Sequence, residues 1–496
     1  MASTNSGVKM ASTNSGGYMI FHPEKAGLFD ILRLCLFKRR LSDCKFVETS
    51  EASLPEQENV RTNGLLLALS MLFQGLLCRL QAPLAFFGAC LEFMLNFFTR
   101  NDGLFGLIVR LITGSIVFPD KNSADYRTIL AFLDSRMDLH KASSLLSGPP
   151  QVRRRDTAQI LDACIMASKV VYENEAYVKN AVTKHWQMEF VGFYNCWNVF
   201  QKAHSTQAFI FSYRPENGKV MIVVAFRGTE PFNGRDWATD VDLSWISMGK
   251  MGRAHMGFMK ALGMQDERDY RKGWPVEYVQ GDEKDDKPLA YYVIREKLKT
   301  LLREHKEADE DAHIIFTGHS LGGALAALFP TILMLHEETT ILNRVWGAIT
   351  YGQPRVGDAT FASFVDAAAA HKNFRAIYRY DAVPRVPFDG SLFQFKHFGN
   401  CIYYNGWYDG QVMKEEPNKN GLDPLHILSK YYHGVEDLVK AEFLGKKEGK
   451  EFEERGLSIL VRVALLILPG LASHFPTEYV NAARLGRLRV FSKDLV

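Results

Sequence analysis

The sequence has few cysteines, no excess of charge of either sign and no leading apolar segment, and each absence narrows the class of protein. Its seven cysteines are scattered along 496 residues without a CxxC pair, so we expect reduced thiols in a cytosol-facing protein and no metal site. The first twenty residues are polar and predict no secretory signal. A net charge of +3 and the lack of any helix-turn-helix or zinc-finger pattern give no reason to expect nucleic acid as a partner.

Apolar material, by contrast, is plentiful, because 47% of the residues are hydrophobic and only 23% are charged. A chain of this length is expected to hold more than one folded unit. Changes in composition divide it into a polar and amphipathic segment at 1–60, an apolar segment at 61–119, a helical linker at 120–155 and a globular part at 156–496. The last part should carry the chemistry, since its composition is that of an ordinary folded domain.

The apolar segment predicts attachment to lipid. Between Gly64 and Phe98 the only charged residues are Arg79 and Glu92, and Pro83 stands near the middle. A proline kinks or ends a helix, so each arm has about 15 residues, or roughly 23 Å of helix. That is short of the roughly 30 Å hydrocarbon core of a bilayer. We therefore expect a hairpin that enters and leaves on one face; a buried helix pair and a spanning helix are the alternatives.

In the globular part, apolar runs that predict strands alternate with stretches that predict helices. Ala208–Tyr213 and Val220–Phe226 are expected to form a hairpin, whereas Val345–Tyr351 and Phe374–Tyr380 are separated by the helical stretch Ala359–Ala370. Such alternation predicts an α/β fold with a largely parallel sheet. The hydrophobic N-terminal extension should be largely helical.

Gly318-His319-Ser320-Leu321-Gly322 lies between a short apolar run and an apolar helix. A Gly-x-Ser-x-Gly pattern on a strand-to-helix turn is typical of a nucleophile elbow, in which the glycines avoid collisions and the serine hydroxyl points out of the sheet. The free N–H groups at the start of the helix can stabilise an oxyanion. An ordinary glycine-rich turn is the alternative reading.

A second oxyanion donor is expected at Thr229, because Val220–Phe226 runs into Arg227-Gly228-Thr229. The next stretch, Glu230–Trp245, includes Phe232 and Trp237 among polar residues. Aromatic side chains in an amphipathic loop over a site are typical of a lid. A helix that packs its tryptophans inward explains the same pattern.

A nucleophilic serine needs a base, and the base needs an orienting carboxylate. In α/β-hydrolases both follow the serine along the chain. Asp381 comes directly after an apolar strand and is the preferred carboxylate, with Asp358 and Asp389 as weaker choices. Spacing does not choose among the four histidines that follow Asp381, although a loop position favours the last. They are His397, His426, His433 and His474.

Five motifs in order resemble the class 3 lipases, the family of the fungal triacylglycerol lipases. They are Val224–Thr229, His255-Met256-Gly257-Phe258, Gly318–Gly323, Tyr351–Gly357 and Asp381-Ala382-Val383-Pro384. The resemblance covers roughly residues 160–490 and implies an α/β-hydrolase fold. It also implies the nucleophile Ser320, the orienting Asp381 and oxyanion donors at Thr229 and the Leu321 N–H, with the lid after the oxyanion strand.

The stretch from His474 to Val480 resembles the terminal histidine motif of the plant members. The resemblance therefore implies His474 as the base and a non-catalytic role for His397, and it leaves His433 as an alternative. With its apolar extension, the whole chain looks like the plant oil-body lipases, although the extension and the long gap between Asp381 and His474 depart from the compact fungal pattern.

These observations predict a serine hydrolase that cleaves triacylglycerol at the cytosol-facing surface of a lipid droplet. Contact with the lipid droplet or a membrane is expected through residues 63–118, and the endoplasmic reticulum membrane is an alternative location. No cofactor, metal or nucleic acid is expected. A phospholipase A1, or a diacylglycerol or galactolipid lipase, is the nearest alternative function. An inactive droplet scaffold is a second.

Overall fold

A computed structural model describes most of the chain. The described residues are 17–27, 29–31, 41–50, 64–140, 152–215, 219–278, 287–369, 372–389, 395–418, 424–448, 452 and 456–489. The segment expected at 1–60 is therefore described only in part.

The centre of the molecule is a nine-stranded sheet in the order β15-β14-β13-β11-β9-β8-β5-β4-β3. Strands β5, β8, β9, β11 and β13 are parallel to one another, whereas β3, β4 and β14 pair antiparallel with their inner neighbours. The expected α/β fold with a mostly parallel sheet is confirmed. The strand bounds are β3 (Glu189–Asn198), β4 (Ala203–Tyr213), β5 (Val220–Phe226), β8 (Ala312–His319), β9 (Val345–Tyr351), β11 (Asn373–Tyr378), β13 (Asn400–Tyr404), β14 (Asp409–Met413) and β15 (Arg487–Arg489).

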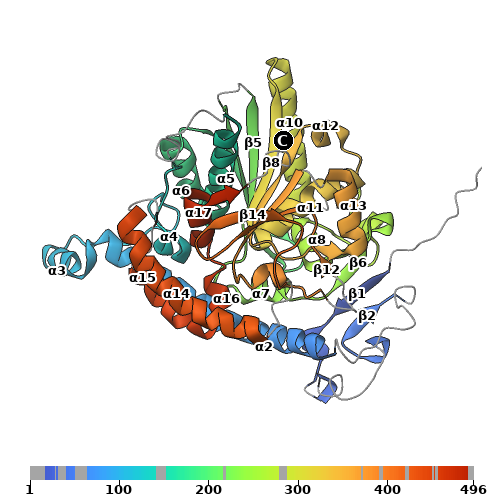
Figure 1. Cartoon of the computed structure of the whole chain (residues 1–496), viewed down its shortest axis with the longest axis horizontal. Coiled ribbons are helices and arrows are strands. Elements are labelled where there is room, and N and C mark those ends of the chain that lie inside the picture. The colour runs from blue at the N-terminus through green and yellow to red at the C-terminus, as the bar shows by residue number, and fades with distance from the viewer. Residues whose placement is uncertain are drawn as a thin grey trace, which may run out of the picture.

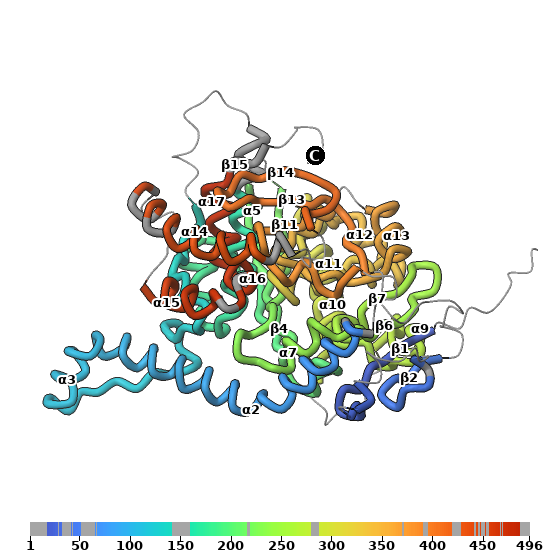
Figure 2. The backbone as a smooth tube through the Cα atoms, turned by 60° about the horizontal axis from the view of Figure 1, so that its bottom comes forward, coloured from blue at the N-terminus to red at the C-terminus, as the bar shows by residue number. Residues whose placement is uncertain are grey.

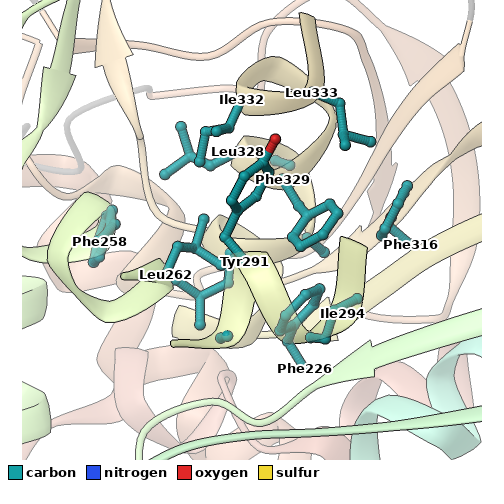
Figure 3. Packing of buried hydrophobic residues seen from close by; sticks show 14 of the residues in the cluster. Phe226, Phe258, Leu262, Tyr291, Ile294, Phe316, Leu328, Phe329, Ile332 and Leu333 are labelled. Atoms are coloured by element: carbon teal, nitrogen blue, oxygen red, sulfur yellow. The ribbon is translucent and has the colours of Figure 1, made fainter. Parts of the chain in front are cut away.

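Helices cover both faces of this sheet, because successive side chains of its buried central strands point to opposite sides. In β8, Ile314 and Phe316 pack against one layer of helices, whereas Ile315 packs against the other. The first layer is α8 (Met256–Leu262), α10 (Ala290–Glu307) and α11 (Leu321–Leu335), with side chains that interlock around Phe329 (Figure 3). The second layer includes α5 (Val152–Val170), α6 (Glu175–Asn180) and α17 (Pro476–Leu485).

A second, antiparallel sheet has the order β12-β10-β7-β6-β1-β2. Its strand β1 pairs with β6, with Met19 opposite Trp245. Part of the N-terminal segment thus belongs to the same folded unit as the globular part. The bounds are β1 (Tyr18–Phe21), β2 (Val47–Thr49), β6 (Trp245–Ser247), β7 (Arg253–His255), β10 (Gly357–Asp358) and β12 (Phe395–Lys396).

The apolar segment is not a hairpin. It forms one continuous helix, α2 (Gly64–Arg100), which passes through Pro83 without a break. By length and hydropathy its stretch Leu67–Arg100 could cross a membrane. In the structure, however, α2 lies along the edge of the globular part (Figure 1), held by contacts on both sides of the proline. Ser70 donates to the Val241 carbonyl at 2.6 Å, and Asn96 donates to the Arg127 carbonyl at 2.8 Å.

The expected helical linker at 120–155 is also wrong for most of its described residues. After α3 (Gly103–Thr113), the chain runs without regular structure to the five-residue helix α4 (Ile129–Leu133). Side-chain hydrogen bonds replace helical ones in this stretch. Asn96 of α2 accepts the Arg127 N–H, and Glu173 accepts the N–H and hydroxyl of Thr128.

The remaining helices lie around the main sheet (Figure 2). Near the carboxyl ends of the parallel strands are α7 (Gly234–Asp240), α14 (Pro424–Glu448), α15 (Gly456–Ala464) and α16 (Pro469–Ala472). The others are α9 (Tyr270–Gly273), α12 (Thr339–Leu342) and α13 (Ala359–Ala369), with short turns η1 (Pro23–Lys25), η2 (Leu41–Asp43), η4 (Ala181–His185), η5 (Gly249–Met251), η7 (Val383–Arg385) and η9 (Leu465–Ile467).

Candidate active site

Ser320 stands on a strained turn between strand β8 and helix α11. Its φ of 58° and ψ of −131° are rare for a residue with a side chain. The flanking glycines are needed because a Cβ at Gly318 would lie 2.2 Å from the Gly322 backbone, and a Cβ at Gly322 would lie 2.2 Å from the Phe226 carbonyl oxygen. The expected nucleophile-elbow geometry is therefore present.

The side chains of Ser320, His474 and Asp381 form a continuous chain of hydrogen bonds. His474 Nε2 lies 2.8 Å from Ser320 Oγ, and His474 Nδ1 lies 2.8 Å from Asp381 Oδ2. Because a carboxylate oxygen can only accept, Nδ1 carries the imidazole proton and Nε2 is free to accept the serine proton. The loop after α16 carries His474, and Asp381 follows β11. The three side chains converge at the carboxyl edge of the parallel strands, where sites in such sheets form.

Asp381 receives two further hydrogen bonds. Tyr479 donates its hydroxyl to Asp381 Oδ2 at 2.5 Å, and the Val383 N–H donates to Oδ1 at 2.9 Å. Burial raises the pKa of Tyr479 well above its usual value, so the phenol stays protonated and remains a donor. The carboxylate is thus fixed in position. Sequence reasoning did not assign this role to Tyr479, although it lies within the stretch that resembled the terminal histidine motif.

Gly352 is a second residue whose role was missed. Its φ is +59°, and a Cβ there would lie 2.9 Å from both Asp381 Oδ2 and the His474 ring. Only glycine leaves room for this hydrogen-bonded pair at the end of β9. The signal in the sequence was a glycine directly after an apolar strand. That two distant segments meet at this glycine is visible only in the fold.

His319 lies next to His474 and contacts its backbone. Its Nε2 lies 2.7 Å from the His474 carbonyl oxygen, which can only accept, so Nε2 carries the proton and Nδ1 accepts from the Tyr172 hydroxyl at 3.0 Å. Burial, reinforced by the neighbouring His474, holds the pKa of His319 well below its usual value. His319 is therefore a neutral ring that fixes the backbone of His474.

Thr229 and Leu321 are the residues expected to donate hydrogen bonds to an oxyanion. The Leu321 N–H opens helix α11, and the first N–H groups of a helix lack acceptors within it. A Cβ at Gly228 would lie 3.1 Å from Ser320 Cβ, so the chain before Thr229 approaches the serine closely. The Thr229 hydroxyl donates to Asp240 Oδ2 at 2.7 Å. Burial raises the pKa of Asp240 to about 8.

Known proteins resemble the chain along nearly its whole length. The model of the family "Lipase (class 3)" matches residues 223–391. Triacylglycerol lipase OBL1 of Nicotiana tabacum is 34% identical, over 97% of this chain and 96% of the relative. The chain belongs to the class 3 lipase family. Phospholipase A1-IIbeta of Arabidopsis thaliana is 30% identical over 44% of this chain and 50% of the relative. The solved triacylglyceride lipase of Rhizomucor miehei is 21% identical over 51% of this chain and 81% of that one, with a TM-score of 0.35.

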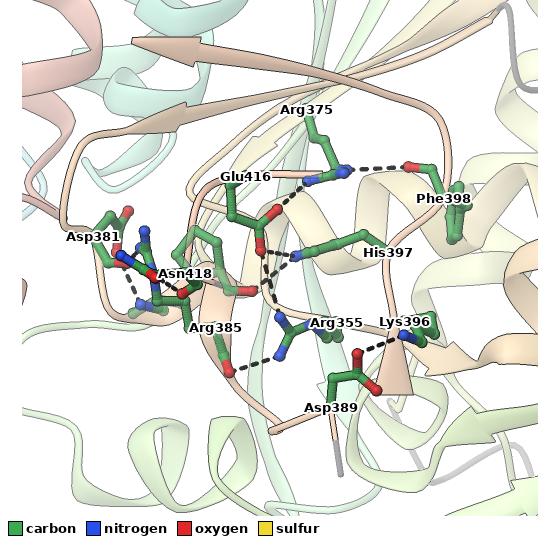
Figure 4. Close-up of polar contacts among 12 residues, drawn as sticks. Arg355, Arg375, Asp381, Arg385, Asp389, Lys396, His397, Phe398, Glu416 and Asn418 are labelled. Atoms are coloured by element: carbon green, nitrogen blue, oxygen red, sulfur yellow. Dashed lines mark hydrogen bonds and ion pairs between the residues drawn. The ribbon is translucent and has the colours of Figure 1, made fainter. Parts of the chain in front are cut away.

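The loop of this class 3 lipase that carries Asp381 is held by a buried network of arginines (Figure 4). Arg355 donates to the carbonyls of Arg385 and Pro387 at 2.8 and 2.9 Å. Arg385 in turn donates to the backbone carbonyl of Asp381. Glu416 pairs with two of these guanidinium groups, at 2.9 Å from Arg375 and 3.4 Å from Arg355. This network fixes the direction in which Asp381 leaves the sheet.

The other histidines with described side chains lie elsewhere in the lipase. His397 is buried in the arginine network, with Nε2 2.7 Å from the Pro384 carbonyl. Burial, reinforced by Arg375, holds its pKa well below the usual value. His433 lies on α14, where it contacts Glu436 and stacks on Tyr380. The side chain of His426 lies outside the described residues.

The two weaker candidates for the orienting carboxylate, Asp358 and Asp389, have other partners. Asp358 accepts the N–H groups of Arg253 and Phe361, and Asp389 pairs with Lys396 at 2.5 Å. Neither carboxylate is in contact with His474. Among the residues that the structure describes, no cluster of three or more His, Cys, Asp or Glu side chains is arranged to hold a metal ion.

Helix α2 covers the segment expected to be a lid. The Phe232 ring packs edge-on against Phe87 at 5.7 Å, and Arg235 donates to Gln81 at 2.8 Å. Trp237, which is half-buried, donates its indole N–H to the Pro231 carbonyl within the same segment. A cavity of about 280 Å³ is lined by residues of this segment and of α2 and reaches Tyr172. Ser320 itself is 1% exposed, so the site is closed.

Proposed function

We propose that this protein hydrolyses the ester bonds of triacylglycerol at the surface of lipid droplets. The observation that carries the proposal is the chain of hydrogen bonds from Ser320 through His474 to Asp381, with both contacts at 2.8 Å. Membership of the class 3 lipase family supports the ester-hydrolase chemistry. A full-length relative named triacylglycerol lipase supports the choice of substrate.

In the proposed reaction, Ser320 is the nucleophile and His474 is the general base. His474 Nε2 takes the hydroxyl proton as Ser320 Oγ attacks the acyl carbonyl, and Asp381 stabilises the imidazolium that forms. His474 then gives that proton to the glycerol oxygen, which leaves as diacylglycerol. Water, activated by the same imidazole, attacks the acyl-serine and releases the fatty acid. No metal or organic cofactor takes part in this scheme.

We assign the oxyanion hole to the Leu321 N–H and to Thr229. In the closed state the Thr229 hydroxyl donates to Asp240, which belongs to the lid segment, and this bond fixes the threonine side chain. Loss of one such donor typically reduces kcat by about 10²- to 10³-fold.

An opening step must precede catalysis, since Ser320 is buried. In our proposal the segment Glu230–Trp245, with Phe232 and Trp237, is the lid. Apolar side chains of α2 and α3 contact the droplet beside it. Their exposure supports this role: Phe86, Phe105 and Ile112 are among the most exposed apolar residues of the chain. A lipid surface is the place where such side chains leave water at a gain in free energy.

Phospholipase A1 activity is the second candidate, because a relative of that name matches the catalytic part. The two functions share the proposed triad and differ in the lipid that enters the site. Rates on triolein droplets and on phosphatidylcholine vesicles, measured with the same preparation, separate them. A rate on vesicles that exceeds the rate on droplets would favour the phospholipase.

Replacement of the nucleophile tests the reaction itself. Ser320→Ala should lower hydrolysis of emulsified triolein by about 10⁴- to 10⁶-fold, as for other serine hydrolases. A fluorophosphonate probe should label the wild type and not the variant. Turnover retained by the folded variant would reject Ser320 as the nucleophile. Folded wild-type protein that neither turns over nor takes the label would favour an inactive scaffold.

A further inference from the structure

Helix α14 has its amphipathic faces reversed relative to an ordinary surface helix. Five of its exposed side chains are apolar or aromatic and recur at i, i+4, i+7, i+11 and i+15, which places them in one stripe along the helix. They are Leu428, Tyr432, Val435, Val439 and Phe443. Tyr432 is 72% exposed and Val439 69%. A surface helix normally buries such a stripe.

Polar side chains attach the opposite face of α14 to the protein. Asp437 and Glu436 pair with Arg379 at 2.8 and 2.6 Å. The hydroxyls of Ser429 and Tyr380 lie 2.6 Å apart. Arg379 and Tyr380 are the two residues directly before Asp381. Helix α14 is thus fixed to the loop of the proposed triad by charge and hydrogen bonds, and its apolar stripe is left facing outward.

Helix α15 repeats this reversal. Leu460 and Val463 are exposed, whereas Ser458 and Arg462 are buried. Arg462 pairs with Glu478, which is buried in α17. The free-energy cost of burying a charge is offset here by a partner of opposite sign. In both α14 and α15, buried charged and polar side chains hold the inner face, and the apolar side chains are exposed.

The reversed helices lie on the same edge of the molecule as α2. In Figure 1, α2, α14 and α15 run along one edge. Figure 2 brings this edge forward and shows α16 and α7 between α2 and α14. The loop after α16 carries His474, and α7 belongs to the proposed lid. The apolar rows of α2 and of α14–α15 therefore flank the proposed lid and the loop that carries His474.

We propose that the outer face of α14 and α15 is a second lipid-docking surface, which seats the protein on the droplet together with α2. This inference rests on the proposed function. An acyl chain would reach Ser320 between the apolar row of α2 and that of α14–α15. A flat lipid surface that delivers it there must also contact the stripe Leu428–Phe443. A tyrosine in the stripe suits the boundary between water and acyl chains, since its ring is apolar and its hydroxyl stays hydrated. The stripe is a single row along one helix, which suits a fluid surface.

Charge placed in the stripe should weaken docking. The double variant Val435→Glu/Val439→Glu is made in the full chain together with Ser320→Ala, so that binding is measured without turnover. Val276→Glu, at an exposed apolar residue outside α14 and α15, is the matched control. Binding is read by flotation with triolein droplets coated with phosphatidylcholine. Circular dichroism and the melting temperature report folding.

The droplet-bound to free ratio should fall about tenfold in the double variant and by less than twofold in the control. With Ser320 restored, triolein hydrolysis, normalised to that of a short-chain ester in solution, should fall by the same factor. Flotation equal to wild type in a folded double variant would overturn the proposal. So would a change from dimer to monomer in analytical ultracentrifugation with unchanged flotation, because a second copy would then cover the face. Absence of turnover by the wild type contradicts the proposed function alone, since flotation is measured independently.

Discussion

Helices α11 and α2 are both long apolar segments with an internal proline, yet they meet their surroundings in opposite ways. In α11, every residue from Leu321 to Leu333 is buried between the sheet and neighbouring helices (Figure 3). In α2, most large apolar side chains are exposed, whereas Gln74 and Asn96 are buried against the globular part. Apolar composition indicates that a segment is stable away from water. The few polar residues indicate which side faces the protein.

The two helices share one feature, which is that an internal proline ends neither of them. Pro330 lies inside α11 and Pro83 inside α2. A proline removes one backbone hydrogen bond and strains the turn before it. In both helices, residues before and after the proline contact the rest of the protein. In α2 these include Ser70 on one side and Asn96 on the other.

The largest effect is expected from one added methyl group next to the closely packed Asp381 and His474, compared with one on the exposed helix α2. Gly352→Ala should lower kcat on a soluble ester by about 10²- to 10³-fold. The new Cβ would lie 2.9 Å from the His474 ring and displace the base. Gly75→Ala in α2, where a Cβ would meet nothing within 4 Å, is the control and should change kcat by less than twofold. A Gly352→Ala enzyme within tenfold of wild type would show that the packing around the triad is loose.

A pair of phenylalanine truncations compares the two helices by stability. Phe329→Ala should lower the free energy of unfolding by about 3–5 kcal/mol, because it leaves a cavity in a closely packed core. Phe86→Ala, at a side chain that is 73% exposed, should change it by about 0.5 kcal/mol or less in the absence of lipid. Urea denaturation followed by circular dichroism measures both. Equal losses would mean that α2 is as much a part of the core as α11.

A smaller effect is expected from the buried carboxyl beside the oxyanion residue. Burial raises the pKa of Asp240 from 3.8 to about 8. The contribution of Asp240 to the free energy of unfolding is therefore fully present below about pH 4. It is lost as the pH rises to about 8. Asp240→Asn should thus melt higher than wild type, by roughly 2–4 °C at pH 8 and by less at pH 5.

The exposed Asp309→Asn is the control for this pH effect. Asp309 lies in a turn with a φ of 58°, which asparagine also tolerates, so its melting temperature should follow the wild type at both pH values. A melting difference between Asp240→Asn and wild type that is larger at pH 5 than at pH 8 would contradict the raised pKa.

Local features of the site were predictable from the sequence. The turn at Ser320 follows in part from short-range sterics, since a Cβ at Gly318 would lie 2.2 Å from the Gly322 backbone. Asp381 was expected because a carboxylate at the end of a buried strand lies at the edge where sites form. The parallel sheet followed from the alternation of strands and helices, and the structure confirms it.

Features that depend on distant contacts were not predictable in the same way. The contact between His474 and Asp381 joins residues 93 positions apart, and spacing alone left four histidines open. Tyr479 and Gly352 gained their roles only when α17 and the end of β9 met Asp381. The hairpin at Pro83 was wrong because the cost of a proline is small beside the contacts that hold α2 along its length.

By itself, the sequence determined the elbow around Ser320, the α/β order of the elements and the presence of an apolar N-terminal helix, because each depends on neighbours a few residues away. The tertiary structure decided which histidine reaches the serine and where α2 and α14 direct their apolar side chains. Those outcomes depend on which polar groups find partners across the fold. A pattern of hydrophobic residues records that a helix has two faces, and only the packed molecule shows which face is turned outward.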